Sequence, residues 1–388
     1  MTEQLSAAVS NASWSQARDL ARGLGRRLGA EAVPIALADR RVAAHSIRAL
    51  LDLPAFDASA MDGWAVRGDA PWQVVGTVHA GDSRRTHLEP GTAVRISTGA
   101  PVPKGSDGIV RTEAGVLDGA QLTGLATTGD VRPAGEECRI GDLLADDGTE
   151  LSPTLIGLLA AAGHDTVAVT VRPRVELLLL GDEIQASGMP HTGSIRDALG
   201  PQVPAWLSRA GAQVTSSLAI PDSLDVLTAA LESARGDLII TTGSTAAGPR
   251  DHLRAAITAA GGSLVVDEVA VRPGHPRLLA TIAERPLVAL PGNPQAAVVA
   301  LLTLGIPLID AQLGRATRSL TSAIVAKDIE GLPDRERLVP GTIEIDGFHP
   351  APHTGAAMLR GVAASSGFAV IPIAGASAGT TVDWLALP

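Results

Sequence analysis

The sequence is poor in aromatic residues and in positive charge. It contains no Tyr, three Phe and five Trp, so the aromatic platforms on which nucleic-acid bases stack are largely missing, and we expect the cores to consist of Ala, Val, Leu and Ile. Acidic residues outnumber basic ones by 41 to 31, and no basic block is available to neutralise phosphates. The composition therefore argues against nucleic acid as a partner.

Cysteine and long apolar runs are also scarce. Cys138 is the single cysteine, which excludes an intramolecular disulfide and any multi-cysteine metal site. The longest apolar stretch, residues 296–309, is interrupted by Gly305 and Pro307, and we expect it to fall short of the roughly 20 apolar residues of a membrane span. The N-terminus lacks the basic and apolar regions of a signal peptide. These features predict a cytoplasmic protein without a membrane span.

Glycine and proline, in contrast, are abundant. The 42 Gly and 26 Pro among 388 residues are typical of many strands and turns, and at about 150 residues per domain the length predicts two to four domains. Changes in pattern along the chain define four predicted units: a split helical and linker domain (1–42 and 135–172), an inserted β-rich domain (43–134), an α/β domain (173–316) and a C-terminal β domain (317–388).

The unit boundaries rest on the periodicity of apolar residues. Residues 1–42 are expected to be mostly helical, and a helix over 153–162 should end at Gly163. Short Val-rich runs such as 72–78 and 93–96 predict strands. Beyond residue 172, predicted strands (175–180, 213–220, 237–241, 263–271 and 287–290) alternate with predicted helices (200–210, 222–234, 250–260 and 294–304). This alternation indicates βαβ units and a largely parallel sheet.

Three loops of the α/β unit are candidates for a binding site, because ligands of open α/β sheets bind beyond the carboxyl ends of the strands. The loops are Gly181-Asp182-Glu183, the segment 242–251 with Gly243, Ser244, Gly248 and Asp251, and Pro291-Gly292-Asn293-Pro294. Glycines let the backbone approach a ligand, a helix directly behind the third loop would offer amides to an anion, and the acidic side chains could hold Mg²⁺. Ordinary loops need Gly and capping Asp or Ser as well, so the residues alone leave both interpretations open.

Two segments of the β-rich unit are open to the same two interpretations. Asp62-Gly63 is either a hairpin turn or part of a functional loop, and the segment 97–103, with Thr98, is either a plain loop or part of that site.

Seven short runs together resemble one family, the molybdopterin molybdenumtransferases, which include MoeA and the E-domain of gephyrin. In chain order they are LPAFDASAMDG (53–63), TGAPVP (98–103), RPAGEE (132–137), GDE (181–183), RPGHP (272–276), LPGNP (290–294) and MLR (358–360). The resemblance covers essentially the whole chain.

The resemblance implies an elongated homodimer with a molybdopterin-binding-like α/β domain and a C-terminal β-barrel. It implies the Mg²⁺-dependent insertion of molybdate into adenylylated molybdopterin, with release of AMP. The active cleft would lie between the α/β domain of one subunit and the β-rich domain of the other. Asp62, Thr98, Glu183 and Asp251 match functional positions of the family, and the three acids among them are the expected Mg²⁺ ligands.

The chain departs from the family pattern where molybdate is expected to bind. The usual Lys-Pro-Gly-Lys-Pro is Arg272-Pro273-Gly274-His275-Pro276 here, and Ala296 replaces a Ser. Arg272 can bind an oxyanion with two donors, whereas His275 is only partly charged at neutral pH. Two hypotheses follow: a transferase that holds molybdate through Arg272, His275 and backbone donors, or a gephyrin-like dimeric scaffold with a protein partner.

Overall fold

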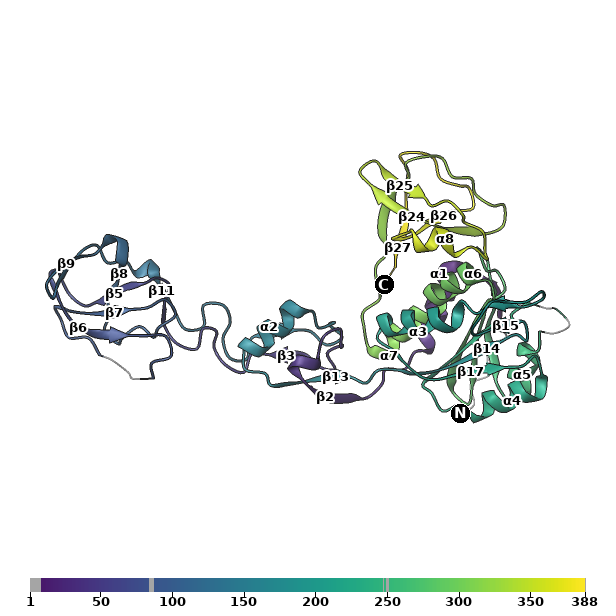
Figure 1. Ribbon diagram of the computed structural model, residues 1–388, viewed down its shortest axis with the longest axis horizontal. Coiled ribbons are helices and arrows are strands. Elements are labelled where there is room, and N and C mark those ends of the chain that lie inside the picture. The colour runs from purple at the N-terminus through teal and green to yellow at the C-terminus, as the bar shows by residue number, and fades with distance from the viewer. Residues whose placement is uncertain (1–7, 84–86, 247, 249–250, 388) are drawn as a thin grey trace.

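The computed structural model describes residues 8–83, 87–246, 248 and 251–387. These residues form an elongated molecule (Figure 1). A β-rich domain lies at one end, a small middle domain follows, and the α/β domain lies at the other end together with the C-terminal domain. The arrangement is the predicted multidomain combination of α/β and β units.

A seven-stranded sheet is the centre of the α/β domain. Its strands, in spatial order, are β1 (Val9–Ala12), β19 (Ser263–Val269), β21 (Leu278–Ile282), β22 (Arg285–Leu290), β18 (Leu238–Thr242), β14 (Arg174–Leu180) and β17 (Gln213–Ile220). All neighbours are parallel except around β21, which is antiparallel to both β19 and β22. The sheet is therefore mostly parallel, as the alternating pattern predicts, with two strands, β1 and β21, that the pattern did not predict.

Helices cover both faces of this sheet. They are α3 (Leu199–Ala210), α4 (Leu224–Ser233), α5 (Leu253–Ala259), α6 (Pro294–Ala300), the π-helical turn η4 (Leu301–Gly305) and α7 (Ile306–Leu313). Along β14, Val175 and Leu177 belong to the core under α3, α6 and α7, whereas Leu178 and Leu180 belong to the core under α4 and α5. Burial on both faces explains the continuous apolar run of this strand.

The segments α6, η4 and α7 form one helix over Pro294–Leu313, and it is long and apolar enough to cross a membrane. The expectation that this stretch is too short was therefore wrong. However, 94% of its most apolar window is buried inside the fold. The helix is hydrophobic all round because it is a core element of the α/β domain.

The N-terminal segment corrects the predicted domain plan. Within residues 8–42 the α-helix is α1 (Trp14–Leu24), followed by β2 (Ala30–Pro34) and the 3₁₀ turn η1 (Ile35–Leu37), so the segment is not mostly helical. β1 is an edge strand of the α/β sheet, and the buried face of α1 belongs to the same core. Local periodicity finds the helix, but only tertiary packing shows which domain it joins.

The middle domain is built from two distant parts of the chain. β2 pairs with β13 (Thr166–Thr170), β3 (Ile47–Arg48) pairs with β12 (Leu143–Ala145), and α2 (Pro153–Ala161) packs beside them. Gly163, with φ +99°, follows this helix where a C-terminal glycine was predicted. The buried Arg315 joins the middle domain to the α/β domain by pairing with Glu150 at 2.7 Å and Asp310 at 3.1 Å.

The β-rich domain contains a six-stranded sheet, a two-stranded ribbon and two 3₁₀ turns. The strands are β4 (Ala58–Ser59), β5 (Gly63–Val66), β6 (Trp72–Val78), β7 (Thr92–Ile96), β8 (Gly108–Arg111), β9 (Val116–Asp118), β10 (Gln121–Thr123) and β11 (Val131–Arg132), and the turns are η2 (Thr112–Ala114) and η3 (Thr128–Asp130). β5, β7 and β8 are the most buried strands of the six-stranded sheet.

The C-terminal domain contains β20 (Val271–Arg272), β23 (Thr321–Ile324), β24 (Glu336–Glu344), β25 (Gly347–Pro350), α8 (Leu359–Ala363), β26 (Gly367–Ile371) and β27 (Thr381–Ala386). Its strands run in the order β20-β24-β26-β27-β23, with β25 on β24. Val325, next to β23, bridges to Phe348 of β25, so the sheet curls until two of its edges meet. Two further short strands, β15 (Ile184–Gln185) and β16 (Ile195–Arg196), pair beside the α/β domain's cleft.

Candidate active site

Three loops converge at the carboxyl ends of β14, β18 and β22, which are neighbours in the sheet. They border a cleft of about 690 Å³. The predicted site residues that line it are Gly181, Glu183, Gly243, Ser244, Asp251, Pro291, Gly292, Asn293 and Pro294. A cleft built from the expected loops therefore lies at this sheet edge.

The loops leave no room for a side chain at Gly243, and they bring Gly292 into van der Waals range of it. Gly243 has φ +82°, and a Cβ there would lie 2.9 Å from the carbonyl oxygen of Leu180. A Cβ on Gly292 would lie 3.6 Å from the Cα of Gly243. Ser244 follows with φ +51°, an unusual conformation for a residue other than glycine. The backbone itself therefore forms the floor between the loops.

Four carboxylates line the cleft, of which only Glu183 and Asp251 were predicted. The other two are Asp197 and Asp222. Asp197 Oδ1 accepts the amide hydrogens of Leu199 and Gly200 at 2.9 and 2.8 Å, which caps the start of α3.

Two further predicted residues of these loops, Asp182 and Gly248, hold cleft residues in place through hydrogen bonds. Asp182 does not line the cleft; its Oδ1 accepts the Asp222 amide at 3.2 Å. Gly248 supports Asp251, because its amide donates to Asp251 Oδ2 at 2.7 Å. Three members of that predicted loop, Ala247, Pro249 and Arg250, lie outside the described residues.

Sequence reasoning also missed two hydrogen-bond donors of the cleft. Arg196, at the end of β16, lines it, and its guanidinium donates to the Gln185 carbonyl at 3.3 Å. The Thr242 hydroxyl is buried and has no hydrogen-bond partner among the described residues. Asp222 follows β17, another parallel strand, so the rule used for the other loops could have found it. Arg196 and Asp197 follow a two-residue strand that leaves no pattern.

The start of α6 corrects the expectation that this helix offers free amides to an anion. The amides of Gln295 and Ala296 donate to the carbonyl oxygen of Ala356, at 3.0 and 3.2 Å. These two donors of the first helical turn are therefore already used and are not free for an anion. Ala357 lines the cleft, so a loop of the C-terminal domain forms part of its wall.

The segment 272–276 reaches the cleft only through Pro276. Arg272 lies in β20, which pairs with β24, and its side chain is exposed. The imidazole of His275 is engaged elsewhere: Nε2 lies 2.9 Å from Asn11 Oδ1, and Nδ1 lies 3.8 Å from Glu268 Oε2. The structure thus does not bring the side chains of Arg272 and His275 into the cleft.

Asp62 and Thr98 form a corner of the β-rich domain. Asp62 Oδ1 accepts the Thr98 amide at 2.7 Å and the Thr98 hydroxyl at 3.1 Å. These two hydrogen bonds, the amide one above all, hold the pKa of Asp62 below its ordinary value. The β-rich domain lies at the opposite end of the molecule from the α/β domain (Figure 1). Within one chain, Asp62 and Thr98 therefore do not meet Glu183 and Asp251.

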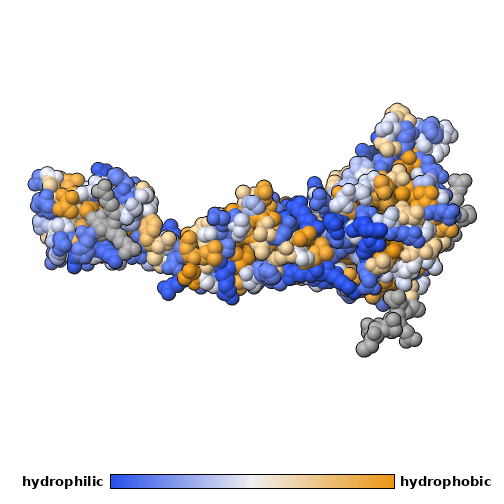
Figure 2. Space-filling view, turned by 90° about the horizontal axis from the view of Figure 1, so that it is seen from below, coloured by the Kyte–Doolittle hydropathy of each residue, from blue (hydrophilic) through white to orange (hydrophobic). Residues whose placement is uncertain are grey.

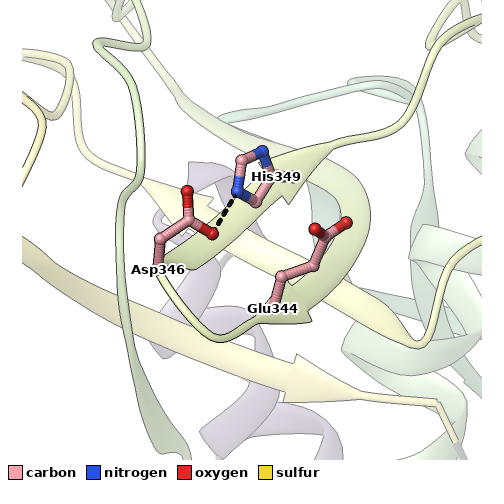
Figure 3. A group of neighbouring side chains, drawn as sticks. All are labelled: Glu344, Asp346 and His349. Atoms are coloured by element: carbon pink, nitrogen blue, oxygen red, sulfur yellow. Dashed lines mark hydrogen bonds and ion pairs between the residues drawn. The ribbon is translucent and has the colours of Figure 1, made fainter.

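Another group with metal-ligand chemistry is Glu344, Asp346 and His349, at the β24–β25 hairpin (Figure 3). Their ligand atoms lie within 4.8 Å of one another. His349 Nε2 already contacts Asp346 Oδ1 at 2.8 Å, which lowers the pKa of Asp346. Both acids are exposed on the hairpin, and we assign no metal to this group.

Fold and cleft together define a multidomain protein with a cleft at the carboxyl ends of the parallel strands of a mostly parallel sheet. Sequence models of known families match three successive segments: the MoeA N-terminal region (domains I and II) over residues 12–163, a probable molybdopterin binding domain over 176–311, and the MoeA C-terminal region (domain IV) over 322–387.

Individual relatives match over most of their length. A molybdopterin molybdenumtransferase of Synechococcus elongatus is 32% identical over 371 residues, covering 89% of this chain and 91% of that protein. Molybdopterin molybdenumtransferase 2 of Mycobacterium tuberculosis is 35% identical over 288 residues, 69% and 71% of the two chains. Two crystal structures of the molybdopterin biosynthesis MoeA protein of Pyrococcus horikoshii superimpose with TM-scores of 0.82 and 0.83, at 25% and 21% identity, over 97% of this chain. The chain belongs to the MoeA family of molybdopterin molybdenumtransferases, and the resemblance of the seven motifs is confirmed.

Proposed function

We propose that this protein inserts molybdate into adenylylated molybdopterin, with release of AMP, in molybdenum cofactor biosynthesis. The observation that carries the proposal is the cleft at the ends of β14, β18 and β22, where glycine-rich loops meet four carboxylates. Relatives that match most of the chain are named molybdopterin molybdenumtransferases, which supports a transfer of this class. The substrate's phosphates and pterin would lie on the Gly243 and Gly292 backbone, where no side chain stands in the way.

The donor chemistry of the cleft fits Mg²⁺. Its described lining residues offer carboxylates and hydroxyls but no His or Cys, and Mg²⁺ prefers one or two carboxylates together with water and phosphate oxygens. Glu183 and Asp251 would hold the ion, which when bound neutralises charge on the phosphates being separated. The unpartnered Thr242 hydroxyl is placed to donate to a bound polar group.

Asp62 and Thr98 would serve the cleft of a second copy. They are too remote to reach the cleft of their own chain (Figure 1), yet Asp62 is held ionised by Thr98. The middle domain carries exposed hydrophobic side chains, among them Leu37, Leu50 and Ile140, and Figure 2 shows hydrophobic patches along this part of the molecule. Exposed apolar surface of this kind marks interaction sites, which supports a homodimer.

A turnover assay tests the proposal. Purified protein is given adenylylated molybdopterin, Mg²⁺ and molybdate, and AMP and pterin-bound molybdenum are followed together. We expect both products from the wild type and a loss of at least about 100-fold in Glu183→Gln. Glu344→Gln, which removes an exposed carboxylate of the C-terminal domain, is the matched control and should retain wild-type rates. Absence of both products with a folded wild-type protein would overturn the proposal.

A further inference from the structure

Arg277 is a buried cation without a carboxylate partner. Its side chain is fully buried, at 0% exposure, and burial lowers its pKa to about 9, so it stays positively charged at neutral pH. No salt bridge joins it to any acid of the described chain. Its guanidinium donates instead to neutral oxygens: the carbonyls of Gly274 and Pro273, both at 2.6 Å, and the Thr303 hydroxyl at 3.1 Å.

This pattern differs from that of the other deeply buried arginine, Arg315. Arg315 is paired with Asp310 and Glu150, so its charge is balanced within the fold. An isolated charge is costly to bury. An arginine that keeps its charge without an acid therefore calls for an anion from outside the chain or for a structural task that neutral groups cannot perform.

The hydrogen bonds of Arg277 set the direction of two peptide units. Because a trans peptide is planar, its N–H points opposite to its C=O. With the carbonyls of Pro273 and Gly274 turned inward to Arg277, the amides of Gly274 and His275 face the other way. Neither amide has an acceptor among the described residues, and both residues are partly exposed. Adjacent free amides of this kind form anion-binding concavities, and the neighbouring Pro276 lines the cleft.

The loop is fixed from below by the core helix. Gly274 has φ +81°, and a Cβ there would lie 2.8 Å from the Arg277 guanidinium and 2.9 Å from Ala296 Cβ. The Thr303 hydroxyl, in the π turn η4, accepts from Arg277 and from Trp14 Nε1 at 3.1 Å each, and donates to the Val299 carbonyl at 2.6 Å. A π turn inside a long helix often marks a functional position; here it presents the hydroxyl that holds Arg277.

We infer that Arg277 is a positioning residue for an oxyanion: its guanidinium orients the 272–276 loop so that the Gly274 and His275 amides bind a tetrahedral oxyanion, and its unbalanced charge attracts that anion. The inference rests on the proposed function, in which the anion is molybdate. The side chains of Arg272 and His275 do not reach the cleft. In this inference the buried Arg277 and the loop backbone bind the anion in their place.

The test compares Arg277→Gln and Arg277→Lys with a matched control, Arg315→Gln. Gln retains a donor to the loop carbonyls but no charge, whereas Lys retains the charge. We expect Arg277→Gln to raise the KM for molybdate by about tenfold, the loss of one charge-assisted contact, with kcat nearly unchanged, and Arg277→Lys to recover part of the affinity. Arg315→Gln should lower the unfolding temperature without changing this KM. A wild-type molybdate KM in folded Arg277→Gln would overturn the inference.

A binding measurement separates this inference from the proposed function. Isothermal titration of the wild type and of Arg277→Gln with tungstate, as a molybdate analogue, needs no turnover. Weaker tungstate binding in the variant supports the inference even if the wild type releases no AMP, and equal binding overturns it even if the wild type is active. If Arg277→Gln does not fold, Thr303→Val takes its place, with Trp14→Phe as the control that removes only the indole donor. Tungstate affinity should then fall in Thr303→Val and stay unchanged in Trp14→Phe, and equal affinity in both would overturn the inference.

Discussion

The α/β cleft and the Asp62 corner are two very different kinds of site on one chain. The cleft gathers four carboxylates, two glycine-rich turns and a buried hydroxyl around one space. The corner has one carboxylate, held by the Thr98 loop. The cleft has walls of its own, whereas the described part of the chain places no such set of groups around the corner. The proposed function thus divides its residues between a preformed pocket and a surface that would act only on the cleft of a second copy.

The largest effect should come from inactivating the Asp62 corner in one chain and the α/β cleft in another. Asp62→Asn and Glu183→Gln should each lower AMP release by at least about 100-fold, because each removes a charged group from one half of a shared site. Co-expressed and randomly mixed, the two variants should recover about a quarter of wild-type activity, since half of the dimers then carry one intact site. Unfolding curves of both single variants serve as the folding control. No recovery in mixed dimers would contradict a site shared between chains.

A smaller effect is expected within the cleft itself. Asp222→Asn should lower kcat/KM by about tenfold, because it removes one of the four negative charges that line the pocket and leaves the loops in place. The measurement is AMP release at several Mg²⁺ concentrations. Wild-type kinetics at all Mg²⁺ concentrations would show that Asp222 takes no part in the reaction. Of the four carboxylates, the predicted pair Glu183 and Asp251 would then remain the main candidates.

The smallest effect concerns the corner alone. Thr98→Ala removes the hydroxyl bond to Asp62 and leaves the stronger amide bond, so the pKa of Asp62 should rise part of the way to its ordinary value. A carboxylate with a lowered pKa contributes stability above its unfolded pKa, and this contribution is lost as the pH falls through the lower native value. In Thr98→Ala the loss should still begin near the unfolded pKa, but it should be smaller and should be complete at a higher pH than in the wild type. Carboxyl carbon NMR across an acid titration measures the shift, and a pKa unchanged from wild type would refute this account of the corner.

Much of the fold follows from local pattern. The strand predicted over 213–220 is β17 to the residue, because the apolar run and its flanking turns are unambiguous. β21 escaped prediction because the turn that joins it to β22, Ala283-Glu284, has positive φ at both residues without the Gly or Asn that signals such a turn. The N-terminal segment was misassigned because its domain membership depends on pairing with β19, more than 250 residues away.

The candidate site likewise contains residues that a sequence rule could find and residues that it could not. The rule for parallel sheets led to Gly181, Glu183 and Asp251 through the loops they occupy. Asp62 and Thr98 came from family resemblance alone, since their residues suit an ordinary turn. Arg277 left no signal, because a sequence does not distinguish an arginine paired with an acid from one buried among carbonyls.

The Ala356 carbonyl accepts two amides at the start of α6, so the C-terminal domain influences the electrostatics of the cleft. Those amides stand beside the Pro291–Pro294 loop at the mouth of the cleft. While the C-terminal domain is in place, these two amides are occupied and are not available to an anion in the cleft. The docked position of the C-terminal domain therefore withdraws two hydrogen-bond donors from the mouth of the cleft.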